Sequence, residues 1–157
     1  MSFGLGYWHW FFLAQPAPLP ERLIGADPDF FLRRRYPEGK LPAFFSPEAF
    51  ADYERCFTPD TIHAICEDYR ATFGVDLEMD NKDFEAKRKI TVPVLLLWGA
   101  TGGVGRNQKS MEIWPRYAAD IRAGKALPCG HYLSEEAPDE TYRELREFFV
   151  ADSGKTA

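Results

Sequence analysis

The chain has 157 residues, of which 45% are hydrophobic and 15% aromatic, so it can bury a core and is not disordered as a whole. This length fits one domain, or one domain with a small attachment. The formal net charge is -5 and no broad basic face is evident, which argues against nucleic-acid binding. The one basic cluster, Arg33 to Arg35, is better interpreted as a solvated helix end.

The three cysteines, Cys56, Cys66 and Cys129, are an odd number at unrelated spacings. This fits a reducing compartment without a disulfide framework. The spacing of Cys56, His63 and Cys66 matches no recognised zinc site, so we expect no metal.

The first residues do not resemble a targeting or membrane segment. The apolar run at the N-terminus has no early lysine or arginine, and His9 and Gln15 interrupt it. It is a poor signal peptide and is too short to span a bilayer. We therefore expect a cytoplasmic protein without a membrane association.

The first part of the chain predicts short helices and no strand. An aromatic run over residues 4–13 is stopped by prolines, and helices are then expected over 21–25 and 28–35. Further helices are expected over 46–57 and 58–73, and Asp27, Ser46 and Thr58 are the expected caps. Ile62, Ile65, Tyr69 and Phe73 lie at helical spacing. Proline-broken helices are typical of a lid, which we assign to residues 1–60, leaving residues 61–157 for a core.

The pattern changes near Lys87, where KRKITVPVLLLWGATGGVG runs from basic to apolar residues and then to glycines. An apolar run without alternation predicts a strand buried on both faces, as in a parallel sheet. A helix over about 111–119, a second short strand and a final helix over 138–150 follow. Two parallel strands are not a finished sheet, because their edges and apolar faces lack partners. The chain is therefore expected to be part of a larger fold, or to pair with another chain.

The segment LPCGHYLSEE places His131 on a loop between the second strand and the final helix. Open α/β sheets carry their chemistry at such strand ends, so His131 is a candidate catalytic base. Gly130 leaves room beside the imidazole, and Glu135 and Glu136 suit the positive end of the following helix. The alternative is a half-buried loop histidine with a satisfied hydrogen bond.

Glycines at Gly99, Gly102 and Gly105 follow the first strand and resemble a dinucleotide-binding loop. This suggests a nicotinamide-dependent oxidoreductase as one alternative. However, polar residues open the next helix, Pro115 interrupts it, and no second strand ends in an acid that could hold a ribose. The glycines could equally form only a flexible loop.

Three segments together resemble the haloacetate dehalogenases, including the fluoroacetate-acting enzymes, of the α/β-hydrolase superfamily. They are YWHWFFLAQPAPLPERLIGADPDFFLRR, CEDYRATFGVDLEMD and VPVLLLWG with LPCGHYLSEEAPDET. The resemblance spans nearly all of the chain and about the second half of a typical member. It implies an α/β class and a partial α/β-hydrolase fold, with a helical lid followed by the last two parallel strands and helices of the core.

The resemblance also implies an activity and a site. In the family an aspartate displaces halide from a small haloacid and forms an ester, which a histidine-activated water then hydrolyses. His131 matches that histidine, and His9, Trp10 and Tyr69 match the halide pocket. Imidazole, indole and phenol are neutral hydrogen-bond donors that suit a departing halide. No metal or organic cofactor is implied, and the alternative for the three lid residues is ordinary packing.

The chain departs from the family in two places. The nucleophile elbow and the acid that orients the histidine are absent. In many other α/β-hydrolases that acid follows the strand equivalent to VPVLLLWG, but here the loop ATGGVGRNQ contains no Asp or Glu, which disfavours epoxide hydrolases. We therefore expect the chain alone to be inactive. A nonenzymatic remnant or pseudoenzyme remains an alternative, and homo-oligomer formation stays open.

Overall fold

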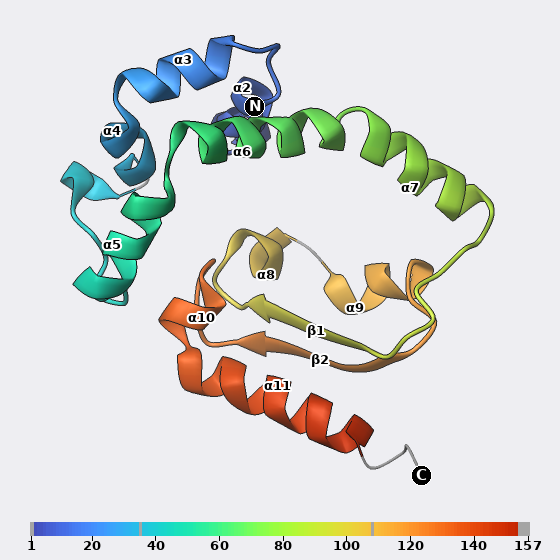
Figure 1. The fold of residues 1–157 in the computed structure, drawn as a ribbon. Coiled ribbons are helices and arrows are strands. Elements are labelled where there is room, and N and C mark those ends of the chain that lie inside the picture. Colours follow the sequence, from blue (N-terminus) through green and yellow to red (C-terminus); the bar gives the residue numbers. More distant parts are fainter. Residues whose placement is uncertain (1, 35, 108, 154–157) are drawn as a thin grey trace. The chain divides into compact units, whose positions relative to one another are not determined.

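The computed structural model describes residues 2–34, 36–107 and 109–153. The chain divides into two compact units, Met1–Lys82 and Asp83–Ala157. The described part of the first unit is helical, as predicted (Figure 1). Its elements are α1 (Ser2–Gly6), α2 (Trp8–Leu13), α3 (Leu19–Ala26), α4 (Pro28–Arg33), the 3-10 turn η1 (Pro37–Gly39), α5 (Pro47–Cys56), α6 (Pro59–Thr72) and most of α7 (Val75–Glu85).

The predicted helix starts in this unit are confirmed. The side chains of Asp27, Ser46 and Thr58 each accept a hydrogen bond from the backbone N–H three residues further on, at 3.0, 3.0 and 3.3 Å. Each cap is followed by a proline in the first turn, where the missing N–H costs nothing. These local signals fix where α4, α5 and α6 begin.

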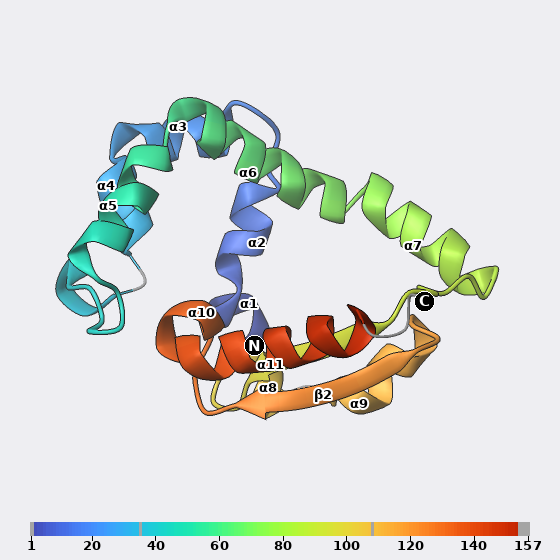
Figure 2. The same cartoon turned by 60° about the horizontal axis from the view of Figure 1, so that its bottom comes forward.

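Helix α6 is the centre of the first unit, and α2 and α3 pack against it (Figure 2). Leu13, Ile24, Ile62 and Cys66 form its buried cluster, and Tyr69 packs against that cluster. The predicted apolar face of α6 is therefore confirmed at its centre. At its end, the exposed Phe73 contacts the ring of Phe11 instead.

The arginines at the end of α4 are not simply solvated, as the sequence suggests, but make contacts within the unit. Arg33 forms an ion pair with Glu54 and is partly buried. The guanidinium of Arg34 lies 3.7 Å from the centre of the Phe31 ring, a cation–π arrangement. Both arginines therefore contribute contacts within this unit. Arg35 lies outside the described residues.

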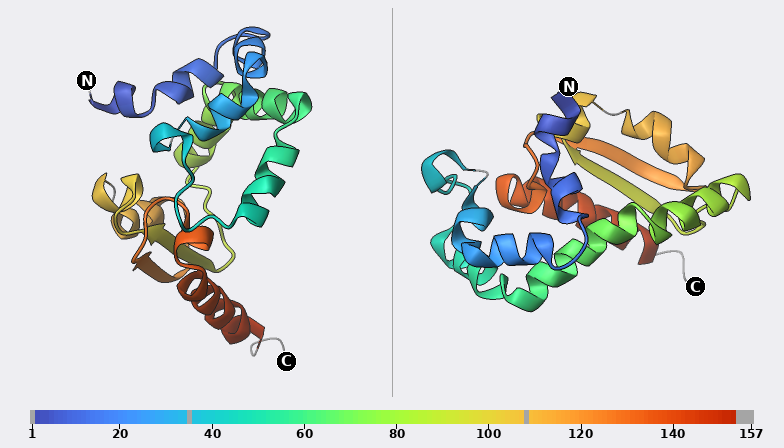
Figure 3. Two further views of the ribbon diagram at one scale, coloured as in Figure 1. Left: turned by 90° about the vertical axis from the view of Figure 1, so that its left-hand side faces the viewer. Right: turned by 90° about the horizontal axis from the view of Figure 1, so that it is seen from above.

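The second unit contains two parallel strands, β1 (Val94–Gly99) and β2 (Ile121–Leu127). Its helical elements are α8 (Gly103–Asn107), α9 (Ser110–Ile113), the 3-10 turn η2 (Trp114–Arg116), α10 (Leu133–Glu136) and α11 (Pro138–Ser153). Helices α8 and α9 lie on one side of the strand pair and α11 lies on the other (Figures 1 and 3). The predicted order of strand, helix, strand and helix is confirmed, although Pro115 converts the expected helix over 111–119 into α9 and η2.

Strand β1 is less buried than its apolar sequence predicts. In the described part of the chain it pairs only with β2, and within it only Leu96 and Gly99 are buried. Helix α11 likewise exposes Tyr142, Leu145 and Phe149, which recur at helical spacing on one face. These surfaces agree with the expectation of an incomplete sheet.

The two compact units divide within α7, at Lys82. The expected extent of the lid, residues 1–60, stays a prediction. Residues 61–82 fall in the helical unit because α6 packs on α2 and α3. The role of this unit as a lid stays a proposal. The three cysteines are free, with Cys56 exposed and the other two buried. Among the described residues, no helix is both long and apolar enough to cross a membrane.

Candidate functional site

His131 lies four residues beyond the end of β2, on the loop that leads into α10. Its side chain is exposed, and its ring lies edge-on to that of Tyr132 with the centroids 5.0 Å apart. Together with β1 residues, Gly130 and Leu133, it lines a groove of about 570 Å³. The imidazole is therefore accessible to solute at a strand end, where a general base could act.

The backbone around His131 is held by one carboxylate. Glu136, in α10, accepts hydrogen bonds from the N–H groups of Gly130 and Tyr132, the second at 2.9 Å. A Cβ at position 130 would lie 2.8 Å from the Glu136 carboxylate, so only glycine fits there without displacing it. Glu136, which the sequence assigns to the start of the final helix, instead ends the separate short helix α10. It holds the histidine loop and positions residue 131 through its two neighbours.

The glycines after β1 allow close backbone contact. A Cβ on Gly99 would lie 1.6 Å from the carbonyl oxygen of Gly130, and a Cβ on Gly105 would lie 2.3 Å from the carbonyl oxygen of Gly99. A dinucleotide would place its phosphates at the N-terminus of α8, but this helix is only five residues long. The glycines are therefore better explained by packing against the histidine loop than by dinucleotide binding or simple flexibility.

In the first unit, the structure brings the three predicted halide-pocket residues together. His9 and Trp10 are neighbours on α2, and Tyr69 on α6 contacts both rings edge-on, with centroid distances of 6.3 and 6.4 Å. His9 is buried, with 7% of its surface exposed, and the other two are partly buried. Three donor-bearing rings therefore meet where α2 packs on α6.

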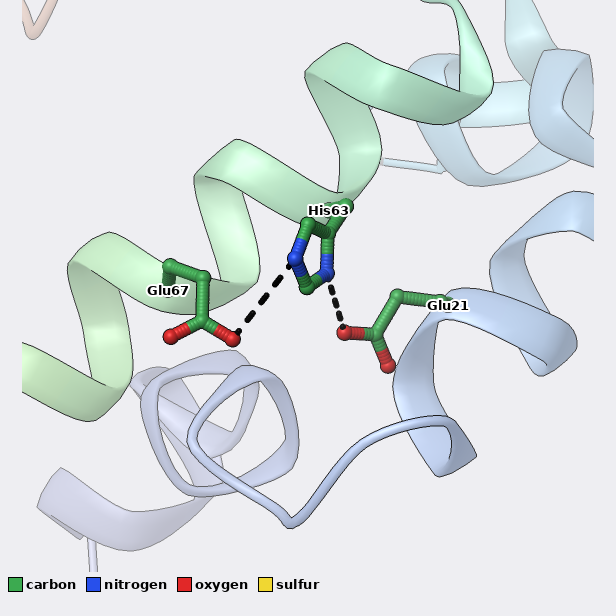
Figure 4. A group of neighbouring side chains, drawn as sticks. All are labelled: Glu21, His63 and Glu67. Atoms are coloured by element: carbon green, nitrogen blue, oxygen red, sulfur yellow. Dashed lines mark hydrogen bonds and ion pairs between the residues drawn. The ribbon is translucent and has the colours of Figure 1, made fainter.

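A second polar cluster joins α3 to α6 beside this packing (Figure 4). Glu21 Oε1 accepts hydrogen bonds from His63 Nδ1 at 3.1 Å and from Arg70 at 2.7 Å. Arg70 also pairs with Glu67, which lies 3.9 Å from the other ring nitrogen of His63. Although Glu21, His63 and Glu67 could hold a metal ion by spacing alone, Arg70 already supplies positive charge to both carboxylates. The cluster therefore acts as an ion-pair network between two helices.

We expect this network to make the first unit sensitive to acid. Burial acts to raise the pKa of Glu21, but hydrogen bonds from Arg70, its own backbone and His63 outweigh it, so the pKa lies below its ordinary value. A lowered folded-state pKa stabilises the fold at neutral pH, and this stability is lost as the pH falls through the lowered value. Glu21→Gln should cost about 2 kcal/mol at pH 7, because it breaks a charge-assisted pair with the largely buried Arg70.

The measurement is urea unfolding of both proteins at pH 7 and near pH 3. The difference in free energy of unfolding between the two proteins should narrow at the lower pH, because Glu21 in the unfolded chain, with its ordinary pKa, is then largely protonated while the folded state resists protonation. Glu78→Gln is a matched control, because Glu78 forms only an exposed pair with Lys82 at 3.9 Å. A difference that stays constant with pH would contradict the assignment.

Comparisons with known proteins show which proteins this chain is similar to. A fluoroacetate dehalogenase from Burkholderia sp. is 39% identical over 150 residues, which are 90% of this chain and 47% of that protein. A soluble epoxide hydrolase from Corynebacterium sp. (strain C12) is 30% identical over 82% of this chain and 44% of its own length. No protein-family model matches the chain.

Solved structures agree with this placement. A protein from Nostoc sp. PCC 7120 described as an α/β hydrolase has a TM-score of 0.84 and 47% identity, over 95% of this chain and 51% of its own. A Pseudomonas aeruginosa protein described as an epoxide hydrolase has a TM-score of 0.84 and 41% identity, over 96% of this chain and 51% of its own. The chain thus spans about half the length of the relatives it matches.

The chain therefore belongs to the α/β-hydrolase superfamily and carries a partial form of its fold. Within that superfamily it is similar to the haloacetate dehalogenases, as its sequence predicted.

Two features of the site were not predicted from the sequence. The hydrogen bonds of Glu136 to the histidine loop could have been suspected, because it lies five residues after His131 and just before the final helix. The ion-pair network of Glu21, His63 and Arg70 joins residues far apart in sequence, so no local signal indicated it.

Proposed function

We propose that this chain supplies the base and the halide-binding donors of a hydrolytic dehalogenase acting on a small haloacid. The observation that carries the proposal is the meeting of His9, Trp10 and Tyr69 at the contact of α2 with α6. The similarity to the Burkholderia fluoroacetate dehalogenase supports the substrate class. We assign no metal or organic cofactor to the reaction.

The proposed reaction has two steps. An aspartate carboxylate from polypeptide outside these 157 residues attacks the carbon that bears the halogen, so a C–O bond forms and the C–halogen bond breaks. The halide leaves with its charge stabilised by the N–H and O–H donors of the three rings. His131 then takes a proton from water while the water oxygen attacks the ester carbonyl carbon. The acyl C–O bond breaks, the leaving alkoxide takes the proton from His131 and departs as the hydroxy acid, and the aspartic acid loses its proton to solvent and returns to the carboxylate.

Epoxide hydrolysis is a second candidate, because two relatives carry that description. Its chemistry would also pass through an ester and a histidine-activated water. The loop after β1, ATGGVGRNQ, contains no acid, which argues against this class. Assays of the completed enzyme with a haloacetate and with a simple epoxide would decide between the two.

Halide binding can be tested on the 157-residue chain itself. In a proton–nitrogen NMR spectrum of the protein, titration with sodium bromide should shift the indole N–H signal of Trp10, which Trp10→Phe would identify. Tyr69→Phe should weaken bromide binding roughly tenfold, because one hydrogen bond to an anion is lost. Tyr142→Phe is the matched control, because Tyr142 is exposed on α11 and should leave binding unchanged.

Catalysis gives a separate test. The chain alone should release no fluoride or chloride from haloacetates, because it lacks the nucleophile. Steady halide release by the purified chain would contradict the proposed division of roles. A Trp10 signal that does not move up to high bromide concentration would contradict the halide site itself.

A further inference from the structure

A fourth aromatic ring lies against the three rings of the proposed halide site. Tyr7 directly precedes α2, and its ring centroid is 6.2 Å from that of His9 and 5.4 Å from that of Trp10. Tyr69 meets the same two rings from α6, at 6.3 and 6.4 Å. All four distances are within the range of contacting aromatic pairs. The four rings therefore form a closed cycle, in which each of the two donors on α2 contacts both tyrosines.

The indole of Trp10 makes edge contacts with two tyrosine rings. The planes of Trp10 and Tyr7 are inclined by 70°, and those of Trp10 and Tyr69 by 63°. Aromatic rings favour this arrangement over a parallel sandwich, because the positive edge of one ring meets the negative face of the other. The Tyr7 contact is the closer of the two, so we expect Tyr7 to constrain the orientation of the indole as well as Tyr69 does.

The backbone keeps Tyr7 and Trp10 on the same side of the chain. The N–H of Trp10 donates to the carbonyl oxygen of Tyr7 at 3.0 Å, and a three-residue spacing places two side chains on one face of a helical turn. Helix α2 has only six residues, and so short a helix depends on packing contacts for its stability. The orientation of the donors on α2 therefore depends on the rings that surround them.

Orientation matters for these donors because a halide is bound through the hydrogen atoms of N–H and O–H groups. A tryptophan side chain rotates about two bonds, and each rotamer directs its indole N–H elsewhere. A donor that already has the bound orientation avoids the entropy cost of being ordered when the anion arrives. A ring that fixes Trp10 before binding therefore strengthens anion binding without touching the anion.

We propose that Tyr7 is a positioning residue of the halide site, and that its ring holds the indole of Trp10 in the orientation that binds the anion. The ring contacts carry this role, so the hydroxyl group of Tyr7 is not required for it. Tyr7 is partly buried, which places its ring within the packing of the first unit. This inference rests on the proposed function, since it takes Trp10 as a halide donor.

Bromide titration, followed at the indole N–H signal of Trp10, tests this role. Tyr7→Leu removes the ring and should weaken bromide binding about fivefold, because the indole is then held by one tyrosine fewer. Tyr7→Phe keeps the ring and should restore binding to within about twofold of the parent chain. Tyr53→Leu is the matched control. Tyr53 also makes edge contacts with two rings of the first unit, those of Phe45 and Phe50, and its loss should leave bromide binding unchanged.

A measurement without bromide separates positioning from folding. The proton–nitrogen nuclear Overhauser effect of the Trp10 indole reports motion on the picosecond to nanosecond timescale. It should fall in Tyr7→Leu and stay at the parent value in Tyr7→Phe and Tyr53→Leu. The melting temperatures of Tyr7→Leu and Tyr53→Leu should fall by similar amounts, because each loses two ring contacts. Tyr7→Met, whose longer side chain fills more of the space of the ring, replaces Tyr7→Leu if that variant does not fold.

Three results would overturn the role of Tyr7 alone. They are bromide binding by Tyr7→Leu that equals that of the parent chain, an unchanged indole signal in ligand-free Tyr7→Leu, and binding by Tyr7→Phe as weak as that of Tyr7→Leu, which would make the hydroxyl the contributing group. A parent chain whose Trp10 signal does not respond to bromide would instead contradict the halide site, and with it both the proposed dehalogenase and this inference.

Discussion

Gly99→Ala is expected to unfold the Asp83–Ala157 unit, at a cost of roughly 4 kcal/mol or more. The added Cβ would lie 1.6 Å from the carbonyl oxygen of Gly130 and 2.9 Å from that of Cys129. These are backbone atoms, and the segments cannot separate easily because the Thr101 N–H donates to Cys129 at 3.0 Å. Domains are stable by only about 5–15 kcal/mol, so most of the margin would be lost.

Far-ultraviolet circular dichroism during urea unfolding measures this cost. Gly25→Ala makes the same chemical change on α3, where an added Cβ would meet nothing within 4 Å. It should be neutral or stabilising by up to about 1 kcal/mol, because alanine is the better helix former. Similar unfolding midpoints for the two variants would contradict the close approach of Gly99 to the histidine loop.

Glu136→Gln is the second large effect, with an expected loss of about 2 kcal/mol. The carboxylate uses one oxygen for the Gly130 N–H and the other for the Tyr132 N–H. A glutamine has one acceptor oxygen, so its amide group would face a second donor and leave that N–H unpaired in a partly buried place. Urea unfolding gives the stability, and amide hydrogen exchange at Gly130 and Tyr132 reports on the two bonds.

Glu135→Gln is the control for this change. Glu135 is the adjacent, half-buried carboxylate and accepts a hydrogen bond from the Ser134 hydroxyl at 2.5 Å. Its replacement should alter stability by less than about 0.5 kcal/mol and leave exchange at Gly130 unchanged. If both substitutions lowered the free energy of unfolding equally, the loss would reflect a general change of charge at α10 and not the hydrogen bonds of Glu136 to the loop.

The parts of the fold that local chemistry decides could be predicted from the sequence. Ser46 and Thr58 marked helix starts because a short side-chain oxygen followed by proline has few other uses. Strand β1 stood out because a short run of leucines between a proline and glycines is typical of a strand in a parallel sheet. The three-ring cluster was expected only through the resemblance, since helical spacing does not say which residues of α2 meet α6.

Other features could not be predicted from the sequence, because local signals are weak there or because they depend on contacts between residues distant in sequence. Helix α7 carries mostly charged residues and no capping signal, so nothing in VDLEMDNKDFE marked it as a helix. Strand β2 reads IRAGKAL, a weak strand former that is held by its parallel pairing with β1. The glycines after β1 could be explained only once the structure showed the Gly130 carbonyl beside Gly99.

The hydrogen bonds that Glu136 accepts from this loop have a consequence for how the loop can change by mutation. It holds main-chain groups on either side of position 131 and makes no use of the imidazole, which is exposed. The proposed proton transfer therefore uses the imidazole of His131, whereas stability depends on the main-chain N–H groups of Gly130 and Tyr132. If His131 is the base proposed above, its exchange for alanine would remove proton transfer yet leave the melting temperature nearly unchanged, so catalysis could be gained or lost here without a folding penalty.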